Sequence, residues 1–129
     1  MLLSHVSIQC VDFDASASFY DAVLAPLGGA RIVDIPPHAI GYGRTGPVRA
    51  PQFWIGPLTT GDGFRESHIA FAAATRGDVD AFFAAATAVG AEVLHTPRLW
   101  PEYTPTYYGA FVRDPDGNNV EACCVAPPS

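Results

Sequence analysis

The chain has 129 residues, 49% of them hydrophobic, and its 13 acidic and 7 basic side chains give a net charge of −6. This length and apolar content suit one compact domain. No cluster of basic residues offers an electrostatic footprint for nucleic acid, and no apolar run approaches the roughly 20 residues that a membrane span needs. We therefore expect neither nucleic acid nor membrane as a partner.

The three cysteines, Cys10, Cys123 and Cys124, do not have the spacing of a disulfide framework. The first residues of the chain lack the charged region and the long apolar region of a signal peptide. Both features favour a cytoplasmic protein with reduced cysteines. We expect these small side chains to be buried rather than to bind a ligand.

The first half of the chain predicts a strand, a helix and three further strands. Residues 4–11 alternate loosely between polar and apolar side chains, which indicates a strand. Asp12 then offers an N-cap, and apolar side chains recur at helical spacing until the glycine pair at 28 and 29 ends the helix. Short strands separated by proline and glycine turns are expected next, at residues 31–35, 39–42 and 52–56.

The second half repeats this order after a polar linker at residues 61–63. A strand at residues 67–73 leads to a helix that Thr75 and Asp78 cap at its start and Gly90 ends. Further strands are expected at residues 92–95, 107–113 and 118–125.

Two connections in the second half have distinctive compositions. Residues 114–117 read Asp-Pro-Asp-Gly, which predicts a tight turn between the last two strands. Residues 97–105 contain three prolines together with Trp100 and Tyr103. This segment is too long for a plain hairpin and too stiff to be disordered, so we expect a loop that could close over a site.

The two halves share more than the order of their elements. His5 and His68 each open a first strand, and the aromatic pair Phe19-Tyr20 recurs as Phe82-Phe83 at the same offset. An offset that is held across a strand and the following helix indicates two structurally equivalent modules. Equivalent modules place their first strands in equivalent positions, so the two imidazoles are expected to face each other.

We therefore predict a single α+β domain of residues 1–129, with module one at about 1–60 and module two at about 65–126. The two β-α-β-β-β modules are expected to form a curved mixed sheet around one cup-shaped site.

This paired module, with a histidine at the start of each first strand, resembles the vicinal oxygen chelate superfamily. The run Arg113-Asp114-Pro115-Asp116-Gly117-Asn118-Asn119-Val120-Glu121 is similar to the closing turn of that superfamily and its metal-binding glutamate. The superfamily includes glyoxalase I, extradiol dioxygenases, fosfomycin-resistance enzymes and bleomycin-binding proteins. The resemblance covers nearly the whole chain and implies a single glyoxalase-like domain.

The resemblance also implies a metal site, because ligands in this superfamily commonly come from the first and last strands of the two modules. The matching residues are His5, His68 and Glu121. The fourth position falls at Trp54, or at Gln52 if the register differs by two, where glyoxalase I would have a carboxylate or an amide. The implied ligand set suits a divalent ion of Fe, Mn, Ni, Co or Zn.

Two imidazoles and one carboxylate leave open positions on such an ion, where adjacent oxygens of a small-molecule substrate can bind. A buried lone carboxylate is costly unless it is paired or ligated, which favours metal binding at Glu121 over an ion pair in a metal-free pocket. Glu121 and Tyr108 are candidates for catalytic proton transfer. Aromatic side chains are expected to line the substrate pocket, at Trp54, Trp100, Tyr103 and Tyr107. His38 and His95 are expected to be exposed, with a supporting role at the site as the alternative.

The leading hypothesis for function is a metal-dependent enzyme, a lyase, isomerase or dioxygenase of the vicinal oxygen chelate type. The alternative is a non-catalytic protein that binds a drug or metabolite, like the bleomycin-binding relatives, which typically lack the metal ligands. A pure interaction module has only the acidic surface in its favour. Relatives build the cup within one chain or across a dimer, and we favour a homodimer in which His5 of one chain meets His68 of the other.

Overall fold

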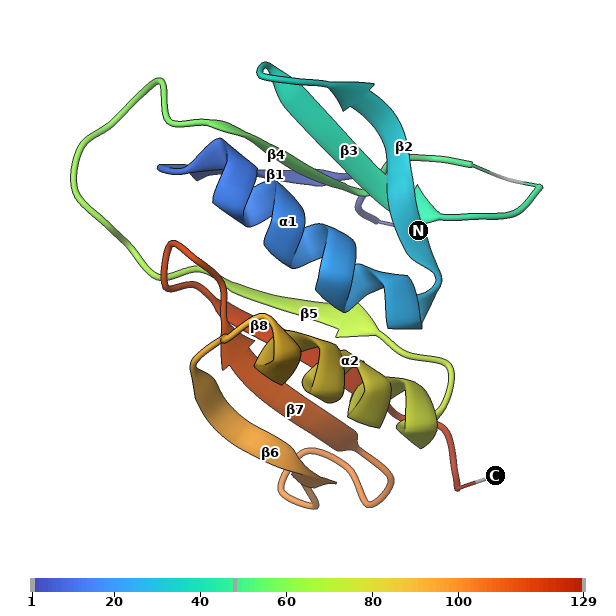
Figure 1. The fold of residues 1–129 in the computed structure, drawn as a ribbon. Coiled ribbons are helices and arrows are strands. Elements are labelled where there is room, and N and C mark those ends of the chain that lie inside the picture. The colour runs from blue at the N-terminus through green and yellow to red at the C-terminus, as the bar shows by residue number, and fades with distance from the viewer. Residues whose placement is uncertain (1, 48, 129) are drawn as a thin grey trace.

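The fold consists of two β-α-β-β-β modules (Figure 1). The computed structural model describes residues 2–47 and 49–128. Module one contains β1 (Val6–Cys10), α1 (Phe13–Leu24), the 3₁₀ turn η1 (Ala25–Leu27), β2 (Gly29–Ile35), β3 (Ala39–Arg44) and β4 (Phe53–Pro57). Module two contains β5 (His68–Ala72), α2 (Arg76–Ala88), β6 (Val93–Leu99), β7 (Tyr108–Arg113) and β8 (Asn119–Cys124). The predicted α+β fold is confirmed.

Helix α1 begins and ends where its local sequence allows. The Asp12 carboxylate accepts a 3.0 Å hydrogen bond from the amide of Ala15, which is otherwise unpaired in the first helical turn. On the inner face, Tyr20 and Val23 are fully buried. Gly28 follows η1 with φ at 79°, a left-handed conformation that glycine adopts without a steric penalty. Within residues 2–47 and 49–128, no helix has the length and apolar character needed to cross a membrane.

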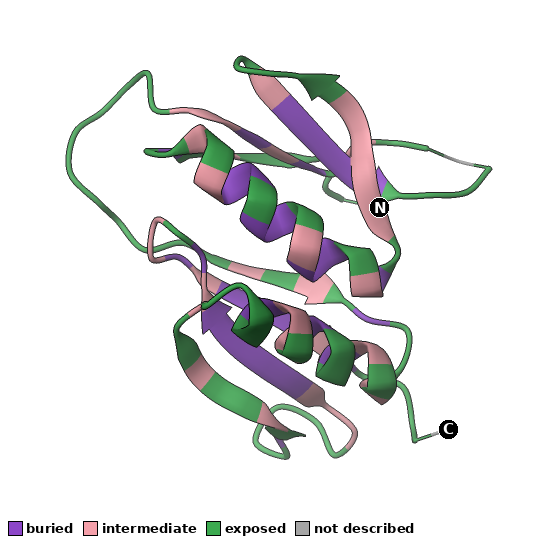
Figure 2. Ribbon diagram, viewed as in Figure 1, coloured by how far each residue is buried: buried purple, intermediate pink, exposed green. Residues whose placement is uncertain are grey.

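Each module forms a four-stranded mixed sheet, with strand orders β1-β4-β3-β2 and β5-β8-β7-β6. The first strand of each module pairs in parallel with the last, and the other pairings are antiparallel. Side chains alternate between the two faces of a strand, so Ala110, Val112 and Val120 point into the core beneath α2. We call the face that points away from the helices the open face of each module. Figure 2 shows that burial follows the inner sides of the helices together with β3 and β7, whereas β5 and β6 are largely exposed.

The two modules share one core. Helices α1 and α2 lie side by side (Figure 1). Phe71 of β5 packs against module one, with its ring centroid 5.2 Å from that of Phe53 and 6.4 Å from that of Tyr20. Burial of these rings on both sides of the junction ties the modules together through the hydrophobic effect.

A polar contact also joins the modules at the turn that precedes β8. The buried Asp114 carboxylate accepts hydrogen bonds from the Tyr20 phenol at 2.6 Å, the Asn118 amide at 2.9 Å and the Asn118 side-chain nitrogen at 3.0 Å. The Asn118 side-chain oxygen in turn accepts from the backbone of Ser67 at 2.9 Å, directly before β5. This network therefore links α1 to the residue that precedes His68.

The structure differs from the prediction along β6, which continues through Pro97 to Leu99 instead of ending near residue 95. β6 is an edge strand whose pairing with β7 is irregular, and such a strand tolerates a proline that cannot donate to the sheet.

Hydrogen bonds connect the loop that follows β6 to the start of β7. The Trp100 amide donates to Tyr107 O at 2.7 Å, and its indole nitrogen donates to Gly109 O at 3.0 Å. The Tyr107 amide donates to Thr104 O at 3.3 Å. These hydrogen bonds hold residues 100–107 together as a wall beside the open face of module two.

Candidate functional site

His68 and Glu121 meet on the open face of module two because β5 and β8 are parallel neighbours. Glu121 pairs with Ala70 in the sheet, which puts it diagonally next to His68. The distance between His68 Nε2 and Glu121 Oε1 is 3.0 Å. Glu121 is only 2% exposed, whereas the His68 side chain is 49% exposed. The buried carboxylate is therefore covered by an imidazole that solvent can still reach.

The second oxygen of Glu121 is held by a phenol. Tyr107, directly before β7, donates a short hydrogen bond to Oε2. Burial, followed by the contact with Glu121, raises the pKa of Tyr107, so this phenol stays protonated in the neutral range and acts as a donor. Both carboxylate oxygens thus have partners, which offsets the cost of burying the charge.

Gly109 makes room for this arrangement. A Cβ at this position would come within 3.3 Å of both Glu121 Oε2 and Tyr107 Cε1. Because such a contact is closer than ordinary packing, a side chain here would require the carboxylate or the phenol ring to shift by a few tenths of an ångström. Glycine at this position therefore leaves room for the contact between Tyr107 and Glu121.

An aromatic wall continues from His68 along the open face. Phe111, opposite Glu121 on β7, stacks with His68 at 5.9 Å between ring centroids. Trp100 lies 5.0 Å from Phe111, and Tyr103 lies 6.0 Å from Trp100 and 5.0 Å from Tyr107. The wall encloses Glu121 with flat, mostly apolar surface, which suits an aromatic or alkyl part of a ligand.

His95 and Arg98 of β6 complete the outer part of this wall. The His95 ring contacts both Trp100 and Phe111, at 5.0 and 5.5 Å between centroids. The Arg98 guanidinium lies 3.4 Å from the centre of the Trp100 ring, a cation–π contact. His95 is thus exposed, as expected, but it belongs to the same wall. His38, by contrast, lies in an exposed turn of module one.

Tyr108 lies on the other side of the sheet from Glu121. Its phenol donates a 2.7 Å hydrogen bond to Asp80 of α2, and the Arg76 guanidinium lies 5.5 Å from its ring centre. Neighbouring residues of a strand point to opposite faces, so Tyr107 and Tyr108 cannot both reach Glu121. Of the two tyrosines, the geometry favours Tyr107 as the phenol of the site.

Module one presents His5 and Trp54 on its own open face. His5 directly precedes β1, and its ring lies 6.5 Å from Trp54 in an edge arrangement. The Ser4 hydroxyl hydrogen-bonds to His5 Nδ1 at 3.0 Å, which leaves Nε2 available. Trp54 is half-buried between the buried residues Phe53 and Ile55. An indole therefore stands beside the histidine where sequence reasoning placed either Trp54 or Gln52.

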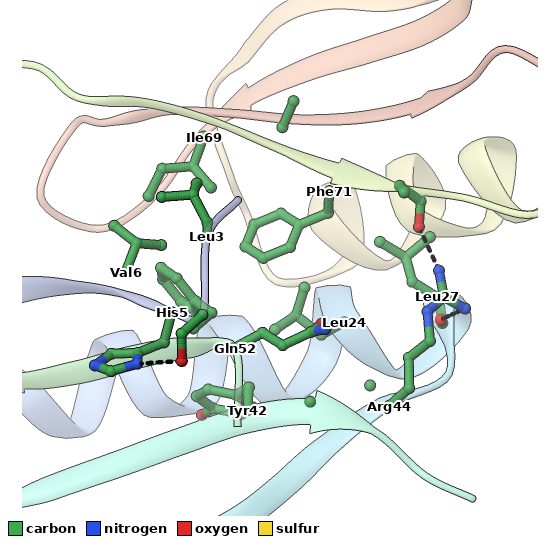
Figure 3. A pocket seen from close by; sticks show the side chains of 16 residues that line it. Leu3, His5, Val6, Leu24, Leu27, Tyr42, Arg44, Gln52, Ile69 and Phe71 are labelled. Atoms are coloured by element: carbon green, nitrogen blue, oxygen red, sulfur yellow. Dashed lines mark hydrogen bonds between the residues drawn. The ribbon is translucent and has the colours of Figure 1, made fainter. Parts of the chain in front are cut away.

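A separate cavity of about 350 Å³ lies between the modules, with apolar walls that include Leu24, Phe53 and Phe71 (Figure 3). His5 lies at its rim. Arg44 lines it elsewhere and donates to Leu27 O at 3.1 Å and to Ala72 O at 2.8 Å, which joins the modules there. This cavity is distinct from the open face that carries His68 and Glu121.

The three expected metal ligands do not converge within one chain. Among residues 2–47 and 49–128, no group of three or more His, Cys, Asp or Glu side chains is close enough to hold an ion. The pair of His68 and Glu121 does fit two adjacent positions of an ion. Ligand atoms about 2.1 Å from one ion and at right angles lie about 3 Å apart, which is the separation of Nε2 and Oε1.

The family model described as the Glyoxalase/Bleomycin resistance protein/Dioxygenase superfamily matches residues 2–122. The chain belongs to this superfamily. The resemblance predicted from the sequence is thereby confirmed. A search of curated proteins returned no match.

Three solved structures show how widely this fold is shared. A glyoxalase/bleomycin resistance protein from Albidiferax ferrireducens T118 is 31% identical, with a TM-score of 0.81 over 96% of this chain and 99% of its own. Lactoylglutathione lyase from Agrobacterium tumefaciens is 21% identical, with a TM-score of 0.66 over 95% and 92%. TioX from Micromonospora sp. ML1 is 17% identical, with a TM-score of 0.70 over 98% and 100%. The last two similarities concern the fold alone.

Within the candidate site, sequence reasoning missed the contact between Tyr107 and Glu121 and the role of Gly109. A signal was present, because residues 107, 109 and 111 alternate onto one face of a strand. If Phe111 pairs with Glu121, that face also carries the Glu121 side chain. The turn at residues 114–117 implies this pairing, since it sets the antiparallel register of β7 and β8.

Proposed function

We propose that this chain is a metal-dependent enzyme of the superfamily that acts on a small molecule with two adjacent oxygens. The observation that carries the proposal is the buried Glu121 carboxylate with the His68 imidazole 3.0 Å away. One nitrogen and one oxygen at this spacing offer two adjacent positions to a divalent ion such as Fe, Mn, Ni, Co or Zn.

The third ligand of the proposed site is His5 of a second copy. His5 is on module one, whereas the pair is on module two, and no third donor joins the pair among the described residues. β1 and β5 are both outer strands of their sheets. Two apolar side chains are exposed here: Leu3, before β1, is 70% exposed, and Val6, the first residue of β1, is 41% exposed. A symmetric dimer would cover these side chains and bring the open face of module one to that of module two.

Within this site, different residues of the chain would have different roles. The chemistry supplied by a bound divalent ion is the polarisation of adjacent substrate oxygens and the stabilisation of their developing charge. Glu121 would hold the ion through Oε1 and accept a substrate proton on the remaining lone pair of that oxygen, while Tyr107 fixes the other oxygen of the same carboxylate. Trp54 and the aromatic wall would exclude water and hold the apolar part of the substrate.

The alternative function is non-catalytic binding of a small molecule. Trp54 favours this alternative, because an indole rather than a carboxylate or amide stands beside His5. Together with the wall formed by Phe111, Trp100 and Tyr103, it offers aromatic surface to a flat ligand. The two retained donors on module two weigh against this alternative.

Metal analysis separates the two functions. Protein purified without chelator and reconstituted with Fe, Mn, Ni, Co or Zn is expected to hold about one ion per chain. His5→Ala, His68→Ala and Glu121→Ala should each lose it. His95→Ala is the matched control, since His95 lies on the same wall but is not a proposed ligand, and it should keep the ion. A wild-type protein that takes up none of these ions would rule out the enzyme proposal and leave the binding protein.

A further inference from the structure

Tyr107 binds one carboxylate oxygen of Glu121 while His68 lies against the other. We infer that Tyr107 is a positioning residue, whose phenol holds Oε2 so that Oε1 alone is left to bind an ion beside His68. This inference rests on the proposed metal site. It concerns a residue that is not itself a proposed ligand.

The position of the Tyr107 phenol is fixed from two directions. Its backbone is hydrogen-bonded on both sides, to the amide of Trp100 at 2.7 Å and to the carbonyl of Thr104 at 3.3 Å. Its ring packs against that of Tyr103 at 5.0 Å between centroids. A phenol held by both backbone and ring loses little further freedom when it donates to Glu121.

The orientation of the carboxylate matters because Glu121 can bind an ion with one oxygen or with both. Two bound oxygens would occupy a position that a substrate with adjacent oxygens needs. The Tyr107 hydrogen bond engages Oε2, and the 2% exposure of Glu121 leaves little room for water to replace that bond. Tyr107 thus favours binding through one oxygen and keeps a position open.

Tyr103 provides a matched control for a purely structural role. It stands in the same aromatic wall, 5.0 Å from Tyr107, and is 58% exposed. In the described part of the chain its phenol has no hydrogen-bond contact with Glu121. Replacing either tyrosine by phenylalanine keeps the ring and removes one hydroxyl, but only Tyr107→Phe removes the bond to the carboxylate.

The test is a titration of metal-free protein with Co²⁺, which reports both affinity and coordination through its visible absorption. We expect Tyr107→Phe to bind Co²⁺ roughly 10- to 100-fold more weakly than wild type, the usual effect of losing a partner of a ligand. Its visible spectrum should also change, because the second carboxylate oxygen is free to enter the coordination sphere. Tyr103→Phe should match wild type in both readouts.

Gly109→Ala disturbs the same contact without removing either partner. The added Cβ would meet Glu121 Oε2 and Tyr107 Cε1 at 3.3 Å, so this variant should also weaken Co²⁺ binding and alter the spectrum. If Tyr107→Phe does not fold, Gly109→Ala decides the question.

The outcomes separate this inference from the proposed function. Wild-type affinity and spectrum in Tyr107→Phe, or in Gly109→Ala if only that variant folds, would overturn the positioning role and leave the metal site standing. A wild-type protein that binds no Co²⁺ and no other divalent ion would overturn both.

Discussion

The phenol of Tyr20, in the helix of module one, donates a 2.6 Å hydrogen bond to the Asp114 carboxylate in the last turn of module two. Both groups are buried, and Asp114 also binds the Asn118 side chain. Through Asn118 the bond extends to Ser67, the residue before His68. The packing of the two modules and the placement of a proposed ligand therefore depend on the same few atoms.

Tyr20→Phe should lower the free energy of unfolding by about 1–2 kcal/mol, because it removes a buried hydrogen bond to a charged group that keeps its other partners. Chemical denaturation followed by fluorescence would measure the loss. Tyr103→Phe, at an exposed position, should change stability by less than about 0.5 kcal/mol. Equal stability of Tyr20→Phe and wild type would mean that this hydrogen bond does not stabilise the packing of the two modules.

Stability should decline above about pH 10. Burial, followed by the charge of Asp114, raises the pKa of Tyr20, and burial likewise raises that of Tyr42. Below the ordinary tyrosine pKa of about 10 both states keep the phenolic protons, so the stabilisation is fully present there. Above it the unfolded chain loses these protons first, and stability falls by up to about 1.4 kcal/mol per pH unit for each such group.

Denaturation curves between pH 8 and pH 12 check this dependence. Tyr20→Phe removes one of the shifted phenols, so its stability should fall less steeply than that of wild type above about pH 10. Parallel slopes for the two proteins would show that Tyr20 does not contribute to the alkaline transition.

A mixture of two defective chains should regain metal binding if the site is shared between copies. In a dimer of His5→Ala with Glu121→Ala, one site carries both changes and the other carries neither. Refolding the two variants together in equal amounts should restore about a quarter of the wild-type metal content, since random pairing makes half of the dimers mixed. Each variant alone should bind none.

A differently tagged copy of each variant identifies the mixed dimer and completes this measurement. Mixed dimers that form but hold no ion would place all ligands within one chain. An ion held by His5→Ala alone would show that His5 is not a ligand.

Co²⁺ should stabilise the folded protein. At a free concentration about 100 times Kd, binding to the folded state alone raises the free energy of unfolding by about 2.7 kcal/mol. A chelator should reverse the gain, and His68→Ala should not show it, whereas His95→Ala should. A similar gain in His68→Ala would indicate that the ion binds elsewhere.

The order of elements was predictable from the sequence because each signal is local. Asp12 and Thr75 cap their helices as predicted, since a cap needs only the next few amides. The path of β6 through Pro97 was not predictable, because a strand's tolerance for proline depends on whether it lies at a sheet edge.

The candidate site was predictable only in part for a related reason. The contact of His68 with Glu121 follows from the parallel pairing of β5 and β8, a feature of the resembled fold. The choice between Tyr107 and Tyr108 depends on the register in which β7 pairs with β8. A register shift of one residue would put the other tyrosine on the face that carries Glu121. Whether His5 joins the pair would depend on the proposed dimer, and no pattern within one chain specifies that.

Gly109 also bears on how selective the proposed centre would be. His68 Nε2 and Glu121 Oε1 lie 3.0 Å apart on neighbouring strands, and Gly109 leaves room for the Glu121 carboxylate beside Tyr107. Because hydrogen bonds hold these two strands together, the two donor atoms would have little freedom to move apart or together around a bound ion. The radius and preferred geometry of an ion would then decide whether the site binds it. Crystal structures with and without a bound ion should superimpose closely at His68 and Glu121.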